Sequence, residues 1–346
     1  MGSEKRYLIL AEGRSADPHY GKTARGVIHY GREPVVAVLD STRAGETYLG
    51  IPIVATVSDA LRFDPTTALV GVATQGGRFP PEWRRLLRSC ISEGLDIENG
   101  LHEFLGEDDE LSELARRHGV ELRDLRKPPP DLSVPTGANM RLDATVVLTV
   151  GSDCAIGKKT VAVELDREAR RRGLRSVFVP TGQTGIAIAG WGIAVDAVVS
   201  DFLAGAAERL VVEGAKRGGE ILFVEGQGSL VHPAYSGVTL GLLHGSAPQL
   251  LVLCHLAGAR EAEGFPGHPL PPLPELVELH ERASLPARRA RVAAIALNTR
   301  DLPEDEAAQA AVRAAAAETG LPAADPVRFG AGPLLEAVLG AARELA

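Results

Sequence analysis

The sequence predicts an α/β protein of two domains, each built around a mostly parallel sheet. Its 346 residues exceed an average domain and suit two of roughly 150 to 200 residues. An apolar fraction of 45% beside a charged fraction of 24% is typical of a globular chain and not of a disordered one. Short apolar runs alternate with helical patterns on both sides of a proline-rich segment, and such alternation predicts parallel sheets.

In the N-terminal half, three apolar runs are each followed by a stretch with helical spacing. We expect strands at residues 6–10, 34–39 and 68–72, and helices at residues 22–30, 58–63 and 81–93. Parallel strands need crossover connections, and these helices supply them. Residues 1–126 are therefore predicted to form a Rossmann-like, doubly wound domain.

A proline-rich segment separates the two halves. Residues 127–131 read Lys-Pro-Pro-Pro-Asp, and Pro135 and Gly137 follow. Proline fixes φ and lacks the backbone donor, so this stretch cannot continue a helix or a central strand. We predict a linker at residues 127–142 and a second domain at residues 143–346.

The C-terminal half restarts the alternation. Strands are expected at residues 144–150, 176–179, 221–224, 249–254 and 293–297, with a helix at 158–172 and alanine-rich helices between short strands or loops in 304–346. Continuous apolar runs of this length are typical of strands covered on both faces. A glycine-rich turn joins the first strand to its helix, which predicts a P-loop NTPase-like domain with a mostly parallel sheet.

Composition argues against several functional classes. The formal net charge of -8 disfavours a nucleic-acid partner, and the arginine-rich runs at 167–175 and 282–291 are interpreted as solvated helix faces. No apolar stretch approaches the roughly 20 residues that span a bilayer, and the first residues lack the pattern of a signal peptide. The 3 cysteines form no CxxC pair and suggest neither disulfides nor a zinc site, so we expect a cytoplasmic protein.

The turn after the strand at 144–150 carries the clearest functional signal. Exposed amides at a helix start favour an anion, glycine lets the backbone approach a phosphate, and a lysine meets phosphate oxygens as a point charge. The residues predicted to bind the phosphate of a cofactor are Gly151, Ser152, Asp153, Cys154, Ala155, Ile156, Gly157, Lys158, Lys159 and Thr160.

This turn departs from the standard P-loop motif. Lys159 stands where that motif has the hydroxyl that binds Mg²⁺, and Thr160 follows about 100° further round the helix. Gly151 also comes one position early. Thr160 and Glu225 are the candidate metal ligands, although the shifted hydroxyl argues against a metal. A glycine turn that only joins strand to helix is the alternative for the whole feature.

Polar residues also follow other predicted strands, where α/β sheets bind ligands. Glu225 follows the strand at 221–224 and is a candidate base, or a cap for the next helix. His232 and Asp201 are further candidates, with a hydrogen-bonded loop histidine and a helix cap as the alternatives. Asn298 either meets a nucleotide base or forms a turn. The predicted cofactor contacts beyond the turn are Gln183, Thr184 and Asn298.

These motifs resemble two known families. Residues 151–160, Thr181-Gly-Gln-Thr-Gly185, Glu225-Gly-Gln-Gly-Ser-Leu-x-His-Pro233 and Asn298 resemble the dethiobiotin synthetase branch of P-loop proteins. The closer resemblance spans nearly the whole chain and is to DgcN-like D-glutamate N-acetyltransferases, long catalogued as a domain of unknown function. In the N-terminal half it rests on Tyr20-Gly-Lys-Thr-Ala24, Asp40-Ser-Thr42, Gly50-Ile-Pro52, Glu98-Asn-Gly-Leu-His102 and Arg126-Lys-Pro-Pro129.

The second resemblance implies acetyl transfer from acetyl-CoA to the amino group of D-glutamate, an acidic small-molecule substrate. The residues that we expect to carry the chemistry are Lys158, Glu225, His232 and Asp201. Lys22, Thr23 and Arg260 are the expected contacts of the substrate. We also expect a homo-oligomer.

Two other functions stay open from the sequence. The dethiobiotin synthetase-like motifs imply ATP and Mg²⁺, and hence a ligase or kinase that activates a carboxylate. Lys159 in the hydroxyl position is instead compatible with a nucleotide- or CoA-binding sensor that performs no chemistry.

Overall fold

The computed structural model describes residues 5–17, 21–72 and 77–345. Contacts divide the chain into two compact units. Unit 1 consists of Met1–Pro128 and Gln183–Ala197, and unit 2 consists of Pro129–Gly182 and Val198–Ala346. Each unit has a mostly parallel sheet with helices, which confirms the predicted α/β class.

Unit 1 is built on a seven-stranded sheet with the order β3-β4-β2-β1-β5-β6-β7. Neighbouring strands are parallel except for β3 and β4. Beyond β3, this order is that of a Rossmann fold, and it reverses at β1. The strands are β1 (Tyr7–Leu10), β2 (Val35–Leu39), β3 (Thr47–Tyr48), β4 (Ile51–Val54), β5 (Thr67–Val70), β6 (Asp96–Asn99) and β7 (Leu122–Asp124).

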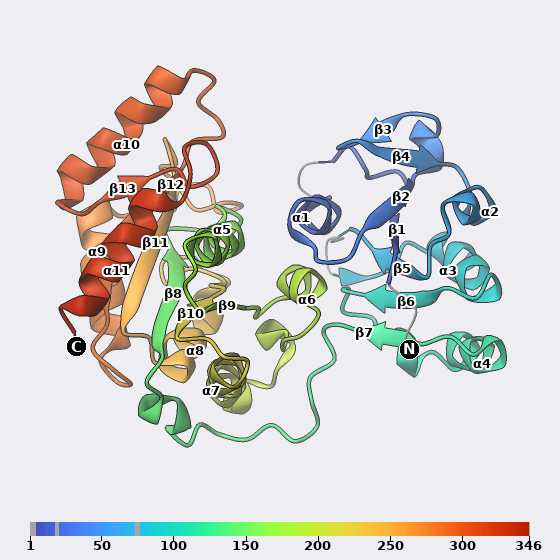
Figure 1. The fold of residues 1–346 in the computed structure, drawn as a ribbon, viewed down its shortest axis with the longest axis horizontal. Coiled ribbons are helices and arrows are strands. Elements are labelled where there is room, and N and C mark those ends of the chain that lie inside the picture. Colours follow the sequence, from blue (N-terminus) through green and yellow to red (C-terminus); the bar gives the residue numbers. More distant parts are fainter. Residues whose placement is uncertain (1–4, 18–20, 73–76, 346) are drawn as a thin grey trace. The chain divides into compact units, whose positions relative to one another are not determined.

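The helices of unit 1 cover a sheet whose central strand is entirely buried. All four residues of β1 are buried, as expected for a strand covered on both faces. Helix α6 lies beside α1 (Figure 1), and the hydroxyls of Thr23 and Thr184 are 2.9 Å apart. The helices are α1 (Lys22–Tyr30), α2 (Val57–Ala60), α3 (Trp83–Ser92), α4 (Asp109–His118) and α6 (Gln183–Ala189).

The segment Gln183–Ala197 belongs to unit 1, although it lies in the middle of the predicted second domain. Ile186, Ile188 and Ala194 from this segment join the hydrophobic core of unit 1. The guanidinium of Arg126 also pairs with Asp196. A short apolar helix fits either core, so local sequence does not reveal which unit receives it.

Unit 2 is built on a six-stranded parallel sheet with the order β13-β12-β11-β8-β10-β9. Its strands are β8 (Thr145–Gly151), β9 (Ser176–Val179), β10 (Ile221–Val224), β11 (Leu250–Leu256), β12 (Arg291–Asn298) and β13 (Ala323–Ala324). The direction of winding reverses at β8, and α/β sheets bind ligands at such a point.

Two groups of helices cover this sheet (Figure 1). Helices α5 and α11 contact each other, while α7, α8 and α9 contact one another in succession. The helices are α5 (Lys158–Arg171), α7 (Ser200–Lys216), α8 (Ser236–Ser246), α9 (Leu273–Ser284), α10 (Asp305–Thr319) and α11 (Gly332–Arg343). In the part of the chain that the structure describes, no helix combines the length and apolarity needed to cross a membrane.

Most of the buried apolar strands were predicted from the sequence, but the apolar β4, which reads Ile-Pro-Ile-Val, and the polar β6 were not. Strands β9 and β10 have the predicted bounds, β8 begins and ends one residue later than predicted, and α5 ends one residue earlier. Strand β6 reads Asp-Ile-Glu-Asn and shows no apolar run. Its Glu98 is nevertheless buried, because it accepts hydrogen bonds from the Tyr7 hydroxyl at 2.8 Å and the Lys5 ammonium at 2.6 Å.

The carboxylate of Glu208 fastens the end of the proline-rich segment onto α7. It accepts hydrogen bonds from the backbone nitrogens of Thr136 at 2.8 Å and Ala138 at 3.2 Å, and from the Thr136 hydroxyl at 2.8 Å. Burial alone raises the pKa of Glu208, but the hydrogen bonds outweigh it and leave this pKa below its ordinary value.

Replacing Glu208 is therefore expected to destabilise unit 2. Glu208→Gln should lower the free energy of unfolding at pH 7 by about 1 to 3 kcal/mol, because Gln loses the charge that strengthens these bonds. The folded-state pKa lies below the unfolded value of about 4.3, so the stabilisation is present above that pH and is lost as the pH falls through the folded-state pKa.

Urea unfolding followed by circular dichroism at pH 7 and pH 3 measures the difference. Glu213→Gln is the matched control on the same helix, since its ion pair with Arg217 is about two-fifths exposed on both sides. The control should change the free energy by less than about 0.5 kcal/mol. Equal losses in the two variants would contradict the role of Glu208.

Candidate phosphate-binding site

The turn between β8 and α5 is held in a conformation that leaves little room for side chains. Gly157 has φ of 114°, in the left-handed region that favours glycine, and Ala155 has φ of 54°. A Cβ on Gly151 would lie 2.8 Å from the side chain of Ile156. The glycines of the predicted motif therefore serve the shape of this turn.

Lys158 is buried within the turn that it begins. Its side chain donates to the carbonyl oxygen of Asp153 at 2.5 Å, and the residue is 6% exposed. Burial lowers the pKa of Lys158, against the opposing influence of Cys154, Cys254 and Asp153. A bound anion would compensate this buried ammonium and restore its preference for the charged form.

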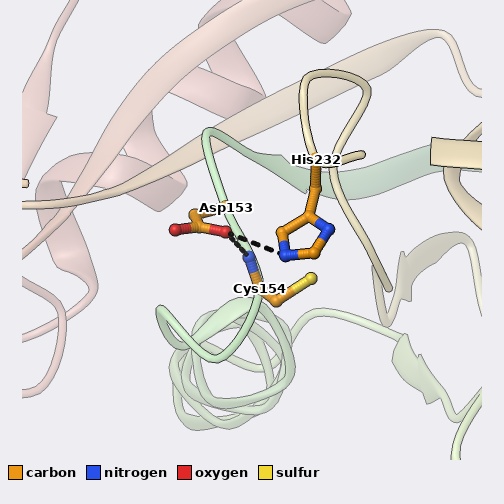
Figure 2. Close-up of side chains that lie close together, drawn as sticks. All are labelled: Asp153, Cys154 and His232. Carbon is orange, nitrogen blue, oxygen red and sulfur yellow. Dashed lines mark hydrogen bonds and ion pairs between the residues drawn. The ribbon is translucent and has the colours of Figure 1, made fainter. Parts of the chain in front are cut away.

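Asp153 connects the turn to two other loops (Figure 2). Its carboxylate accepts from the backbone nitrogen of Cys154 at 2.6 Å and from that of Glu263 at 2.7 Å. Nε2 of His232 lies 3.9 Å from the same carboxylate and 3.2 Å from the carbonyl oxygen of Glu263. The loops that contain His232 and Glu263 are thereby fixed against the turn.

Asp153, Cys154 and His232 place three potential metal ligands within 4.8 Å of one another. Their hydrogen bonds do not suit a metal. Nδ1 of His232 accepts from the backbone nitrogen of Ala234 at 3.2 Å, so the ring proton resides on Nε2. The nitrogen nearest Asp153 is then a donor without a lone pair for a cation, and both Asp153 oxygens already accept backbone hydrogens.

The same bonds define the role of His232 in this arrangement. One ring nitrogen accepts from the backbone and the other donates to it. The ring also stacks on Tyr235, with centroids 4.9 Å apart, and meets the edge of Phe265 at 5.0 Å. In this structure His232 is a hydrogen-bonded loop histidine, and its predicted part in catalysis stays a prediction.

Glu225 directly follows β10, as predicted, and the structure places β10 next to β8 in the sheet. Its Oε2 accepts from the backbone nitrogens of Thr181 at 2.9 Å and Gly182 at 3.1 Å. These two partners belong to the loop after β9 and not to α8, the helix that follows Glu225. Gly226 next to it donates to the Thr149 hydroxyl at 2.9 Å.

Asn298 and Arg300 contact the turn from the end of β12. The side-chain nitrogen of Asn298 donates to the Ile156 carbonyl at 2.9 Å, and its oxygen accepts from the Arg300 backbone at 3.1 Å. The Arg300 guanidinium lies 3.4 Å from the Ala155 carbonyl oxygen. Asn298 therefore supports the turn in this structure, and its predicted contact with a base stays a prediction.

Sequence reasoning missed two residues beside the turn. The hydroxyl of Ser152 lies 2.8 Å from Nδ1 of His255, and burial lowers the pKa of that histidine. Arg300 stands two positions after Asn298, and its nearness to this predicted site residue is the signal by which the sequence could have indicated it. His255 lies at the end of an apolar strand, where the sequence pattern gave no signal.

The remaining predicted residues are distributed over both units. Asp201 is exposed in the first turn of α7, and Arg260 is exposed in the loop before α9. Lys159 and Thr160 are half-buried in the first turn of α5. In unit 1 lie Lys22, which is exposed, Thr23 and Thr184, which contact each other, and Gln183. Tyr20, from the first family motif, lies outside the described residues.

Two family models match the chain. A Rossmann-like domain of unknown function, DUF1611_N, matches residues 40–128, and a P-loop domain of unknown function, DUF1611_C, matches residues 133–335. A crystal structure of a DUF1611 family protein from Anabaena variabilis has 40% sequence identity and a TM-score of 0.91, and the match covers 97% of this chain and 99% of that one.

Two curated relatives carry the same name, D-glutamate N-acetyltransferase. The protein from Tritonibacter scottomollicae is 35% identical over 97% of this chain and 98% of its own length. The protein from a Pseudoalteromonas species is 39% identical over 58% of this chain and 59% of its own length. The recognition of the family from the sequence is thereby confirmed.

Gly226 lies so close to β8 that we expect this position not to tolerate any side chain larger than that of glycine. An ideal Cβ there would lie 1.6 Å from the carbonyl oxygen of Thr149, so Gly226→Ala must displace the loop that carries Glu225. We expect a loss of about 3 kcal/mol or more in the free energy of unfolding.

Urea unfolding measures this loss, with Gly237→Ala in α8 as the matched control. A Cβ at Gly237 meets nothing within 4 Å, so the control should be neutral or stabilise the helix by up to about 1 kcal/mol. A Gly226→Ala variant as stable as its control would show that the loop is not packed as described.

Proposed function

Because this chain belongs to the DUF1611 family and is an N-acetyltransferase, we propose that it transfers the acetyl group of acetyl-CoA to the amino group of an acidic D-amino acid such as D-glutamate. The turn at residues 151–160 holds a phosphate of coenzyme A. The observation that carries this assignment is the buried ammonium of Lys158 at the start of α5.

The turn suits a phosphate for electrostatic reasons. Backbone amides at the start of a helix favour negative charge, and the Lys158 side chain lies among them. A buried ammonium without a counter-charge is costly, and its lowered pKa reflects that cost. Coenzyme A offers a pyrophosphate that would supply the charge, while its pantetheine arm carries the thioester away from the turn.

The proposed reaction is a direct acyl transfer. The neutral amine of the acceptor attacks the thioester carbonyl, the carbon–nitrogen bond forms, and the carbon–sulfur bond breaks. The amine proton passes to a base and the coenzyme leaves as a thiolate, so no ATP is consumed. The enzyme must supply the base and hydrogen-bond donors for the oxyanion.

The hydrogen bonds and the exposure of the three candidate bases distinguish Asp201 from Glu225 and His232. Glu225 accepts two backbone hydrogen bonds, and both ring nitrogens of His232 are engaged. Asp201 is the exposed carboxylate of the set. We therefore assign Asp201 to positioning and deprotonating the amine, and Glu225 and His232 to holding the loops beside the turn.

An acidic acceptor needs cations for its carboxylates. Arg260 is exposed in the loop before α9 of unit 2, which suits a role in binding the acceptor, and Lys22, exposed at the start of α1 in unit 1, stays a candidate from the sequence. Thr23 is a poorer candidate, because its hydroxyl contacts that of Thr184 and its side chain is 2% exposed.

A second candidate function is an ATP-dependent ligase that activates a carboxylate. The P-loop-like turn and the nearby Glu225 favour it, with Thr160 and Glu225 as the Mg²⁺ ligands. Release of ADP that requires both Mg²⁺ and an organic acid would support it. Calorimetry without measurable ATP binding would exclude it.

Removing the buried charge should weaken binding of the donor. Lys158→Met is expected to raise the dissociation constant of coenzyme A by about 10-fold to 100-fold, which is the usual strength of a hydrogen bond to a charged group. Isothermal titration calorimetry measures the constant, and thiol release from acetyl-CoA with D-glutamate and no ATP measures the activity.

The control for this variant is Lys216→Met at the exposed end of α7, which removes an equal charge. It should bind coenzyme A as the wild type does. An unchanged constant in Lys158→Met would contradict the phosphate site. A wild-type protein that releases no thiol with any of several amino acids would contradict the proposed reaction.

Loss of the proposed base should reduce turnover. Asp201→Asn is expected to lower kcat by about 100-fold or more and to leave KM for acetyl-CoA within a few-fold. Glu225→Gln should chiefly raise KM, since it disturbs the loops beside the turn. Steady-state kinetics of both variants separates the roles, and an Asp201→Asn enzyme with wild-type kcat would remove Asp201 as the base.

A further inference from the structure

The two sides of the turn differ in charge. In the sheet, β10 adjoins β8 on one side, and its loop brings the buried carboxylate of Glu225. On the other side, β12 follows β11, and its loop brings Arg300 to the Ala155 carbonyl oxygen. An anionic ligand on the turn therefore has an acidic neighbour on one side and a cationic one on the other.

The backbone of Arg300 is held by hydrogen bonds, although its side chain is exposed. Its backbone nitrogen donates to Asn298, and the Asn298 side chain in turn donates to the Ile156 carbonyl of the turn. Asn298 therefore connects the backbone of Arg300 to the turn and keeps the guanidinium near it.

The present contacts of the guanidinium are easily exchanged. It lies 3.4 Å from the Ala155 oxygen and 3.6 Å from the carboxylate of Asp301. The side chains of Arg300 and Asp301 are 56% and 63% exposed, and ion pairs with such exposure contribute little free energy. A phosphate within reach would offer a bidentate partner in their place.

Coenzyme A carries such a second phosphate. If its pyrophosphate lies on the turn, the adenosine must leave on one of the two sides, and its ribose bears a 3′-phosphate. The side of Glu225 would repel a dianionic group, whereas the side of Arg300 would attract it. Charge alone thus selects the direction of the adenosine.

We propose that Arg300 binds the ribose 3′-phosphate and makes this enzyme select coenzyme A over dephospho-coenzyme A. This inference rests on the proposed function, in which the turn holds the pyrophosphate. It adds a specificity-determining residue that recognises the one group by which the nucleotide of coenzyme A differs from ADP.

Replacing Arg300 and omitting the 3′-phosphate should each weaken binding by the same factor. Because both changes remove one interaction, making them together should weaken binding no further. Isothermal titration calorimetry of wild type and Arg300→Ala, each with coenzyme A and with dephospho-coenzyme A, gives the four dissociation constants of a thermodynamic cycle. We expect wild type to bind coenzyme A about 10-fold to 100-fold more tightly than dephospho-coenzyme A, as for a charge-assisted hydrogen bond. In Arg300→Ala the two ligands should bind within about twofold of each other.

Two further variants sharpen the result. Arg313→Ala, on the exposed face of α10, removes an equal charge and should keep the wild-type preference. Arg300→Lys retains the charge but not the planar fork, so it should restore part of the preference. In steady-state assays with acetyl-CoA as the varied substrate, Arg300→Ala should keep kcat and raise KM for this donor.

The possible results distinguish a failure of the role proposed for Arg300 from a failure of the proposed acetyl transfer. If Arg300→Ala weakens both ligands equally, or if the wild type does not distinguish them, Arg300 does not read the 3′-phosphate, while the acetyltransfer stands. If wild type binds neither ligand and acetyl-CoA supports no turnover, the proposed donor fails and this inference fails with it.

Discussion

The turn between β8 and α5 depends on the hydrogen bond from the buried ammonium of Lys158 to the carbonyl oxygen of Asp153. A positive charge that is 6% exposed needs polar partners, and the carbonyl oxygen of Asp153 supplies one. To present that oxygen, the chain must fold back within the turn, which requires the left-handed conformation at Gly157. The shape of the turn and the burial of its cation are therefore one constraint.

The same turn organises the loops around it through Asp153. Because this carboxylate accepts from two backbone nitrogens, it fixes the loop of Glu263 and, through it, His232. These bonds also determine the tautomer of His232. A histidine, a cysteine and a carboxylate that resemble a metal site by distance alone thus act together as a hydrogen-bonded support.

Local sequence was informative where one physical effect dominated. The apolar strands at β8, β9 and β10 were predictable because strands buried on both faces need continuous apolar runs. Strand β6 was not, since its Glu98 is buried through partners that lie some 90 residues away in the sequence. Helix α6 lies within the predicted second domain in the sequence but packs in the core of unit 1, and its apolar side chains would fit either core.

The sequence by itself determined that this chain is a two-part α/β protein with a P-loop-like turn, since periodicity and glycine chemistry act within a few residues. The tertiary structure decided which side chains meet that turn. Strand order places the loops of β10 and β12 near β8, and this order follows from non-local pairing. Arg300 and Glu225 therefore acquire their positions from hydrogen bonds between strands that no local pattern records.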